Sequence, residues 1–187
     1  MDDKIASLKL QIARAFADVP SPGDDVDDLV VTFGAGEGED IADAFRGRHW
    51  KDMPLDLILE NFYFASSLTH MTPQAFHYYL PGFLLLLLDR PDSEPDGPTL
   101  WNLAPPEPDP ELENIFAPKD LEGKPLEPVM PGAFYEYAIK KYRERMGLLS
   151  PAQRKAVLAF LDFQGKLATD EEEPAIRRAI TSISGLG

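Results

Sequence analysis

The fold depends on one stretch, Leu68-Thr-His-Met-Thr-Pro-Gln-Ala-Phe-His-Tyr-Tyr-Leu-Pro-Gly-Phe-Leu-Leu-Leu-Leu-Leu88. Thr72 offers a side-chain oxygen to the free N–H groups of a helix start, and Pro73 fits the first helical position. The aromatic and leucine-rich residues that follow predict a long buried helix. Pro81 removes one backbone hydrogen bond and crowds the carbonyl of His77, so we expect this helix to kink in its middle.

Segments before this stretch also have helical periodicity. Apolar residues three and four positions apart predict a first helix over residues 3–18. A short apolar run at 29–33 is either an isolated strand or an extended segment. A second helix is predicted over residues 39–45 and a third from about 54 to 67. The third helix would have a broad buried side formed by Leu55, Ile58, Leu59, Phe62 and Phe64.

The carboxy-terminal third is again helical. An apolar stripe at 135–146 ends at Gly147, a residue that commonly terminates helices. Ser150, Pro151 and Gln153 read as a cap, a first-turn proline and a reciprocal glutamine at the start of the next helix. A last short helix is predicted near 172–183. We therefore expect an all-α fold.

Residues 91–131 have a different composition. They contain 11 of the 18 prolines, which excludes long helices and central strands. Apolar residues recur through them, however, whereas disordered segments have few such anchors. We expect an ordered proline-rich strap across the helical body, with a helical turn near 111–116. The chain is then a single domain, 1–187, a helical bundle whose body is 1–90 and 132–187.

The charge is concentrated in two blocks. The net charge is −14; residues 1–45 carry 11 acids and 3 bases, and residues 91–131 carry 10 acids and 2 bases. Such a surface repels nucleic acids and anionic lipids and attracts basic partners. The basic run from Lys140 to Arg145 lies near a helix end, where cations complement the dipole, and we expect it to face the acidic strap.

Other features bear on the compartment and on catalysis. The chain has no cysteine, begins Met1-Asp2-Asp3-Lys4 without a secretory leader, and has no apolar run of the roughly 20 residues that span a membrane. These features predict a soluble cytoplasmic protein. No serine lies in a nucleophile-elbow motif, and we expect no catalytic residue and no cofactor.

Two motifs resemble ligand sites but fail on spacing. The glycines at 34–38 match neither the dinucleotide nor the phosphate-loop pattern, and the neighbouring acids would repel phosphate. The aspartates at 24–28 lack the glycine and the acid that a calcium loop needs. The three histidines are not paired at helical spacing. We expect no metal site.

The leading functional hypothesis is a non-catalytic acidic protein-interaction module with a basic protein partner. A bacterial immunity protein that masks a basic toxin or effector would fit, and a regulatory or scaffold role is open as well. Oppositely charged proteins associate quickly and with strong salt dependence. The candidate contact residues come from both acidic blocks: Asp24, Asp25, Asp27, Asp28, Glu107, Asp109, Glu111 and Glu113.

The alternative hypothesis is a small-ligand binder or an enzyme. Its pocket would open beside the kink at Pro81 and be lined by His77, Tyr78 and Tyr79. The large aromatic residues Trp50 and Trp101 are expected to anchor the core or the strap, or else to form an interaction hot spot bordered by acids.

Two motifs resemble those of a bacterial domain-of-unknown-function family. They are Phe45-Arg-Gly-Arg-His-Trp50, a Phe-x4-Trp motif, and Leu68-Thr-x-x-Thr-Pro-x-Ala-Phe-x-Tyr-Tyr-Leu-Pro-Gly-Phe-Leu84, which is similar to the family's Leu-Thr-Pro-x-Ala-Phe-x-Tyr-Tyr-Leu-Pro. The resemblance covers about residues 20–90. It implies a soluble bacterial protein and no established activity.

Overall fold

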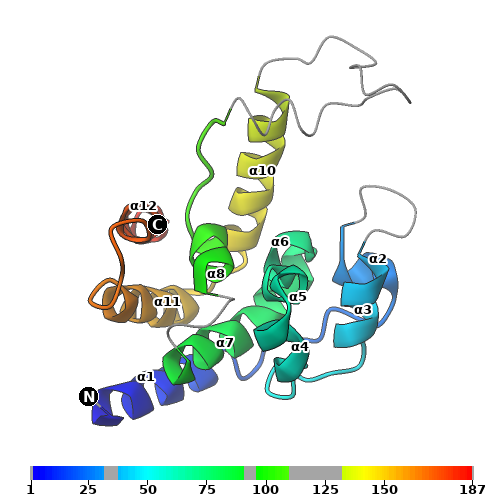
Figure 1. Ribbon diagram of the computed structural model, residues 1–187, viewed down its shortest axis with the longest axis horizontal. Helices are drawn as coiled ribbons and strands as arrows, with labels where there is room; N and C mark the ends of the chain where they lie inside the picture. Colours follow the sequence, from blue (N-terminus) through cyan, green and yellow to red (C-terminus); the bar gives the residue numbers. More distant parts are fainter. Residues whose placement is uncertain (1, 32–37, 91–95, 110–131, 187) are drawn as a thin grey trace.

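The computed structural model describes residues 2–31, 38–90, 96–109 and 132–186 (Figure 1). In these residues the fold is all-α, as predicted, and the extended backbone pairs at one isolated antiparallel bridge, between Val30 and Met71. The helices are α1 (Asp2–Ala15), α2 (Val26–Leu29), α3 (Glu39–Phe45), α4 (Leu55–Glu60), α5 (Phe62–Ala65), α6 (Ser67–His70), α7 (Pro73–Asp89), α8 (Asp96–Leu103), α10 (Ala133–Gly147), α11 (Pro151–Gln164) and α12 (Glu173–Ser184).

Helix α7 is the central element. The Thr72 side chain accepts a hydrogen bond from the Ala75 N–H at 3.1 Å, and Pro73 occupies the first turn, so the predicted start of this helix is confirmed. The helix continues through Pro81 to Asp89. The kink at Pro81 stays a prediction. Helices α1, α2, α6, α8 and α10 all contact α7, which explains why nearly its whole circumference is apolar.

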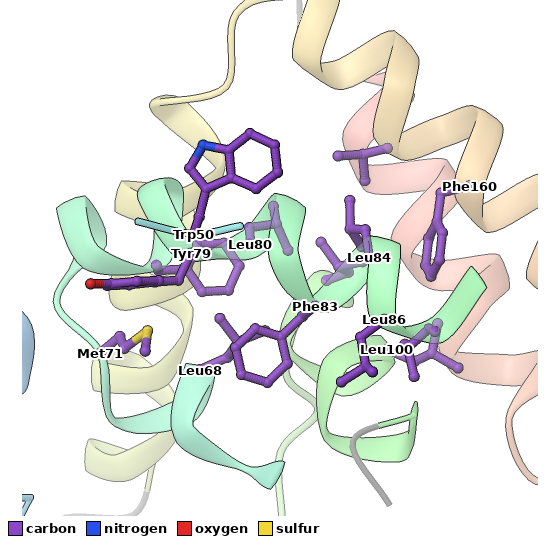
Figure 2. Packing of buried hydrophobic residues seen from close by; sticks show 14 of the residues in the cluster. Trp50, Leu68, Met71, Tyr79, Leu80, Phe83, Leu84, Leu86, Leu100 and Phe160 are labelled. Atoms are coloured by element: carbon purple, nitrogen blue, oxygen red, sulfur yellow. The ribbon is translucent and has the colours of Figure 1, made fainter. Parts of the chain in front are cut away.

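One hydrophobic core joins residues from α1 to α12. Figure 2 shows its central part, where Trp50, Tyr79, Phe83 and Leu84 pack together and Phe160 of α11 closes one side. Fully burying a side chain of this size contributes about 1.5–3 kcal/mol relative to leaving it exposed. The core is therefore large enough to fix the position of every helix that contributes to it.

The segment after α2 is tied to the start of α7. The Val31 N–H donates to the His70 carbonyl at 2.8 Å, and the Thr72 N–H donates to the Leu29 carbonyl at 3.0 Å. The Thr72 hydroxyl also donates to the Asp28 carbonyl at 2.7 Å. Of the run 29–33, Leu29 ends α2, which neither alternative predicted, and Val30 is extended and forms the isolated bridge with Met71. Thr32 and Phe33 lie outside the described residues.

The predicted third helix is wrong as one continuous element. Asn61 has extended backbone angles, φ −140° and ψ 116°, which end α4, and its side chain accepts from the Tyr63 N–H at 2.9 Å to start α5. Asparagine favours this capping role because its short side chain satisfies a free N–H group. The break changes the buried face. Ile58 is buried, but Leu55 and Phe62 are exposed instead of sharing its side.

The beginning of the expected strap is helical. Helix α8 packs on α12, α6 and α7, with Leu100 and Leu103 buried. Pro98 lies in the first turns of α8, where a missing N–H costs no helical hydrogen bond. Trp101 does not anchor the strap, because it is largely exposed. The helical turn predicted near 111–116 lies outside the described residues.

The predicted cap at the start of α11 is confirmed. The Ser150 side chain accepts from the Gln153 N–H, and the Gln153 side chain accepts from the Ser150 N–H at 2.8 Å, which is the reciprocal pair expected at the start of α11. Helix α11 packs between α1 and α12. In the part of the chain that the structure describes, every helix is too short or too polar to cross a membrane.

The close approach at Gly82 gives a stability prediction. A Cβ atom at this position would lie 2.5 Å from the Trp50 carbonyl oxygen and 2.6 Å from the Met53 sulfur. We expect Gly82→Ala to lower the free energy of unfolding by about 1–3 kcal/mol, since the backbone carbonyl cannot move without disturbing the core.

Gly147→Ala is the matched control. It is also a helical glycine, but nothing lies within 4 Å of its added Cβ. This variant should be neutral or more stable, by up to about 1 kcal/mol. Urea unfolding of both variants measures the difference, and equal stabilities would contradict the close approach.

Candidate functional site

The four aspartates predicted from the first acidic block lie together on and just before α2. Helix α2 packs on α3, which adds three further acids to the same region. We call this set the α2–α3 acidic surface; its members are all exposed and are Asp24, Asp25, Asp27, Asp28, Glu39, Asp40 and Asp43. The second half of this acidic segment is a helical turn.

The backbone under this surface is held by specific contacts. The Asp24 carbonyl accepts from Arg46 Nε at 2.8 Å, and its carboxylate accepts from the Gly47 N–H at 3.1 Å. Gly23 has φ 111°, and a Cβ there would lie 2.2 Å from the Asp28 carboxylate. Only glycine adopts this backbone conformation readily and leaves room for the carboxylate.

The surface keeps most of its charge. Arg46 pairs with Asp43 at 2.8 Å. The carboxylates of Asp25, Asp27 and Asp28 make no ion pair with any residue that the structure describes. Several like charges thus lie close together in water without a matching cation. Such an arrangement produces a strong negative potential over one part of the molecule.

Glu107 of the second acidic block does not join this surface. Glu107 lies 3.0 Å from the guanidinium of Arg178 on α12, so its charge is already paired. In Figure 1, α12 lies at the left of the view and α2 at the right. Asp109 is half-buried. Glu111 and Glu113 lie outside the described residues. The structure therefore brings together the first four of the eight predicted contact residues.

The residues of the alternative pocket are all engaged in packing contacts or hydrogen bonds. His77 Nε2 lies 2.9 Å from the Gln153 side-chain oxygen, while Tyr78 packs edge-on against Tyr79 with ring centroids 4.9 Å apart. The Tyr79 hydroxyl lies 2.8 Å from the Phe45 carbonyl, and burial raises the pKa of this tyrosine far above its usual value. These side chains serve packing and hydrogen bonding, and their geometry does not favour the pocket hypothesis.

A buried arginine is the main polar feature that the sequence did not predict. Arg145 is 4% exposed, and its guanidinium donates to the carbonyls of Leu68 and Met71, both at 2.7 Å. It also donates to the Asn102 side chain at 2.7 Å. Burial lowers the pKa of Arg145 to about 10. We expected this residue to face acids of the strap, but its partners among the described residues are neutral oxygens.

Lys141 lies one helical turn before Arg145 and binds the same region. Its Nζ donates to the Thr69 carbonyl at 2.8 Å. Burial and then the charge of Arg145 lower the pKa of Lys141 to about 7. The last carbonyls of a helix have no partner within the helix and attract cations. The hydrogen bonds of Arg145 and Lys141 therefore hold α10 on the carboxyl end of α6, which suits a structural role.

Comparisons with known proteins give one match. A family described as "Family of unknown function (DUF6714)" matches residues 4–117. No curated protein and no solved structure matches the chain. The match is longer than the region over which the sequence motifs resemble a family. It covers α1 to α8 and ends before α10.

The depressed pKa of Lys141 predicts a pH dependence of stability. Below pH 7 this lysine is protonated in both states; above pH 7 the folded state loses the proton that the unfolded state keeps up to about pH 10.4. The free energy of unfolding should therefore rise, by about 2 kcal/mol between pH 7 and 9. Lys141→Met should remove this rise, and Lys140→Met, at an exposed position, should keep it. Urea unfolding at several pH values measures both.

The contacts of Arg145 predict a large loss of stability when it is replaced. Arg145→Met leaves buried carbonyls without donors, and we expect the free energy of unfolding to fall by about 3 kcal/mol or more. Arg143→Met is the control, because Arg143 lies on the exposed side of the same helix. A similar denaturation midpoint for the two variants would show that the buried hydrogen bonds contribute little.

Proposed function

We propose, for a chain that belongs to the family of unknown function DUF6714, a role as a non-catalytic acidic module that binds a basic protein partner. The binding region is the α2–α3 acidic surface. One observation supports this proposal above the others: Asp25, Asp27 and Asp28 are exposed, close in sequence, and without an ion pair among the described residues.

Preorganisation of the backbone favours binding by this surface. Asp24 is fixed through Arg46 and Gly47, and the Asp28 carbonyl accepts from the Thr72 hydroxyl. The carboxylates therefore lie on a turn whose backbone is already ordered, so binding of a partner does not have to order it. Association costs less when the contact segment is already in its bound conformation.

The proposed partner is a protein with a positive surface. An immunity protein that masks a basic toxin or effector is the most specific role of this kind, and a regulatory or scaffold protein would use the same chemistry. The net charge of −14 supports fast association with such a target through long-range attraction. No contact in the described residues favours the enzyme alternative over packing, so we do not propose it.

Affinity capture from the native cell tests the proposal. The wild-type protein should retain one or a few basic proteins at low salt. The variant D25N/D27N/D28N should lose them, because it removes three unpaired charges without touching the core. Mass spectrometry of the retained proteins measures this. The control D3N/D170N/E171Q removes the same number of exposed charges elsewhere and should retain the partner.

The association kinetics of a captured partner provide a second measurement. Since exposed charges are screened within about 10 Å at 0.1 M salt, the association rate constant should fall by about tenfold or more between 0.05 and 0.5 M salt. The dissociation rate constant should change much less. A partner that binds equally well to D25N/D27N/D28N, or with a salt-independent rate, would contradict the proposed role of the acidic surface.

A further inference from the structure

Helices α4 and α5 leave large apolar side chains in water. The exposed fractions are 43% for Leu55, 44% for Leu57, 58% for Phe62 and 38% for Tyr63. Leu55 and Leu57 belong to α4 and Phe62 and Tyr63 to α5, and because the two short helices contact each other we treat the four residues as one region. We call it the α4–α5 apolar surface, defined by Leu55, Leu57, Phe62 and Tyr63. Clustered exposed apolar residues are more often found where a partner binds than scattered single ones.

The surface is held rigidly by the core beneath it. Ile58 of α4 and Ala65 of α5 are fully buried and fix the two helices to the body of the protein. The Tyr63 ring packs edge-on against Phe64 at 5.4 Å and lies 5.8 Å from the His70 ring. A backbone that is already fixed does not have to be ordered on binding, which lowers the cost of association.

The charged residues within α4 and α5, Asp56 and Glu60, are both acidic. Asp52, Asp56 and Glu60 are exposed and make no ion pair with any described residue. The sequence has no lysine or arginine from residue 52 to residue 89. The nearest base in the sequence, Lys51, lies with its Nζ 5.0 Å from the Trp50 ring centroid. The apolar side chains are therefore interspersed with carboxylates.

These charges determine which kinds of partner can bind at the α4–α5 apolar surface. In a two-fold symmetric dimer the same patch meets itself, so the apolar contact would bring Asp56 and Glu60 of one copy close to the same acids of the other. Like charges placed together at an interface cost several kcal/mol. Anionic lipids and nucleic acids are repelled in the same way. A partner segment with apolar anchors and flanking cations is complementary in both respects.

We infer that the α4–α5 apolar surface docks a basic amphipathic helix of a protein partner. Such a helix presents apolar residues at i, i+3, i+4 and i+7, which fits a compact set of apolar contacts, and its lysines or arginines would lie against Asp56 and Glu60. The inference refines the proposed function, on which it rests for the positive charge of the partner. It depends on different residues from the α2–α3 acidic surface.

The test uses a defined probe, a fluorescent 18-residue helical peptide with leucines along one face and lysines on the flanks. Fluorescence anisotropy at 0.15 M salt measures its affinity for the full chain. The double variant L57S/F62S should weaken binding by about tenfold or more, since hot-spot anchors contribute more than 1 kcal/mol each. L10S/L167S replaces two other exposed leucines and should bind within about twofold of wild type.

Peptide controls separate shape from charge. A peptide of the same composition with its leucines scattered around the helix should bind at least about tenfold more weakly, because it lacks an apolar face. A peptide with glutamates in place of the lysines should not bind. D56N/E60Q should weaken binding of the lysine peptide and reduce its salt dependence. Circular dichroism and thermal unfolding check that each variant is folded.

The outcomes distinguish this inference from the proposed function. Three results would each overturn the docking site. In the first the lysine peptide does not bind at all, in the second the peptide with scattered leucines binds equally well, and in the third folded L57S/F62S keeps the affinity of the wild type. If D25N/D27N/D28N abolishes binding and L57S/F62S does not, the docking site fails and the acidic surface stands. Loss only in L57S/F62S supports the docking site and removes the acidic surface from the contact.

Discussion

The hydroxyl of Thr72 connects the acidic surface to the core. It accepts from the Ala75 N–H to start α7 and donates to the Asp28 carbonyl, 44 residues earlier in the chain. The backbone bridge between Val30 and Met71 lies beside it. The position of α2 therefore depends on where α7 begins. A rigid central helix, buried on nearly all sides, provides the frame from which the exposed carboxylates extend.

A second constraint links the part of the chain that matches the family with the part that does not. The family match ends at residue 117, but Arg145 and Lys141 of α10 bind carbonyls of residues 68–71, which lie inside the match. Leu149 and Phe160 belong to the same core as α7. The carboxy-terminal helices are thus part of the same folded unit as the amino-terminal helices, and they complete the environment of α6 and α7.

Local chemistry made much of the fold predictable. The caps at Thr72 and Ser150 use groups within three residues, so sequence alone identifies them. The break at Asn61 was missed because the apolar spacing from Leu55 to Phe62 suits one continuous helix, and a single capping side chain decides otherwise. The exposed surface on α4 and α5 follows from that break, so it could not be inferred from the periodicity.

Ion pairs and hydrogen bonds between residues far apart in the chain could not be predicted from the sequence. Nothing near Glu107 indicates that Arg178 will neutralise it, and nothing near Arg145 indicates that it will be buried against carbonyls. Both depend on how α8, α10 and α12 pack. The first acidic block was predictable as a charged surface. Its carboxylates are neighbours in the sequence, and few lysines or arginines lie close to them in the sequence.

The way Arg145 is bound has an evolutionary consequence. Its guanidinium contacts main-chain oxygens at positions 68, 69 and 71, and every amino acid supplies such an oxygen. Replacing those side chains would leave the acceptor oxygens in place, but Leu68 and Met71 are constrained separately by the core, in which both are buried. Only the guanidinium of Arg145 supplies these donors, so selection for the hydrogen bonds acts on the residue at position 145.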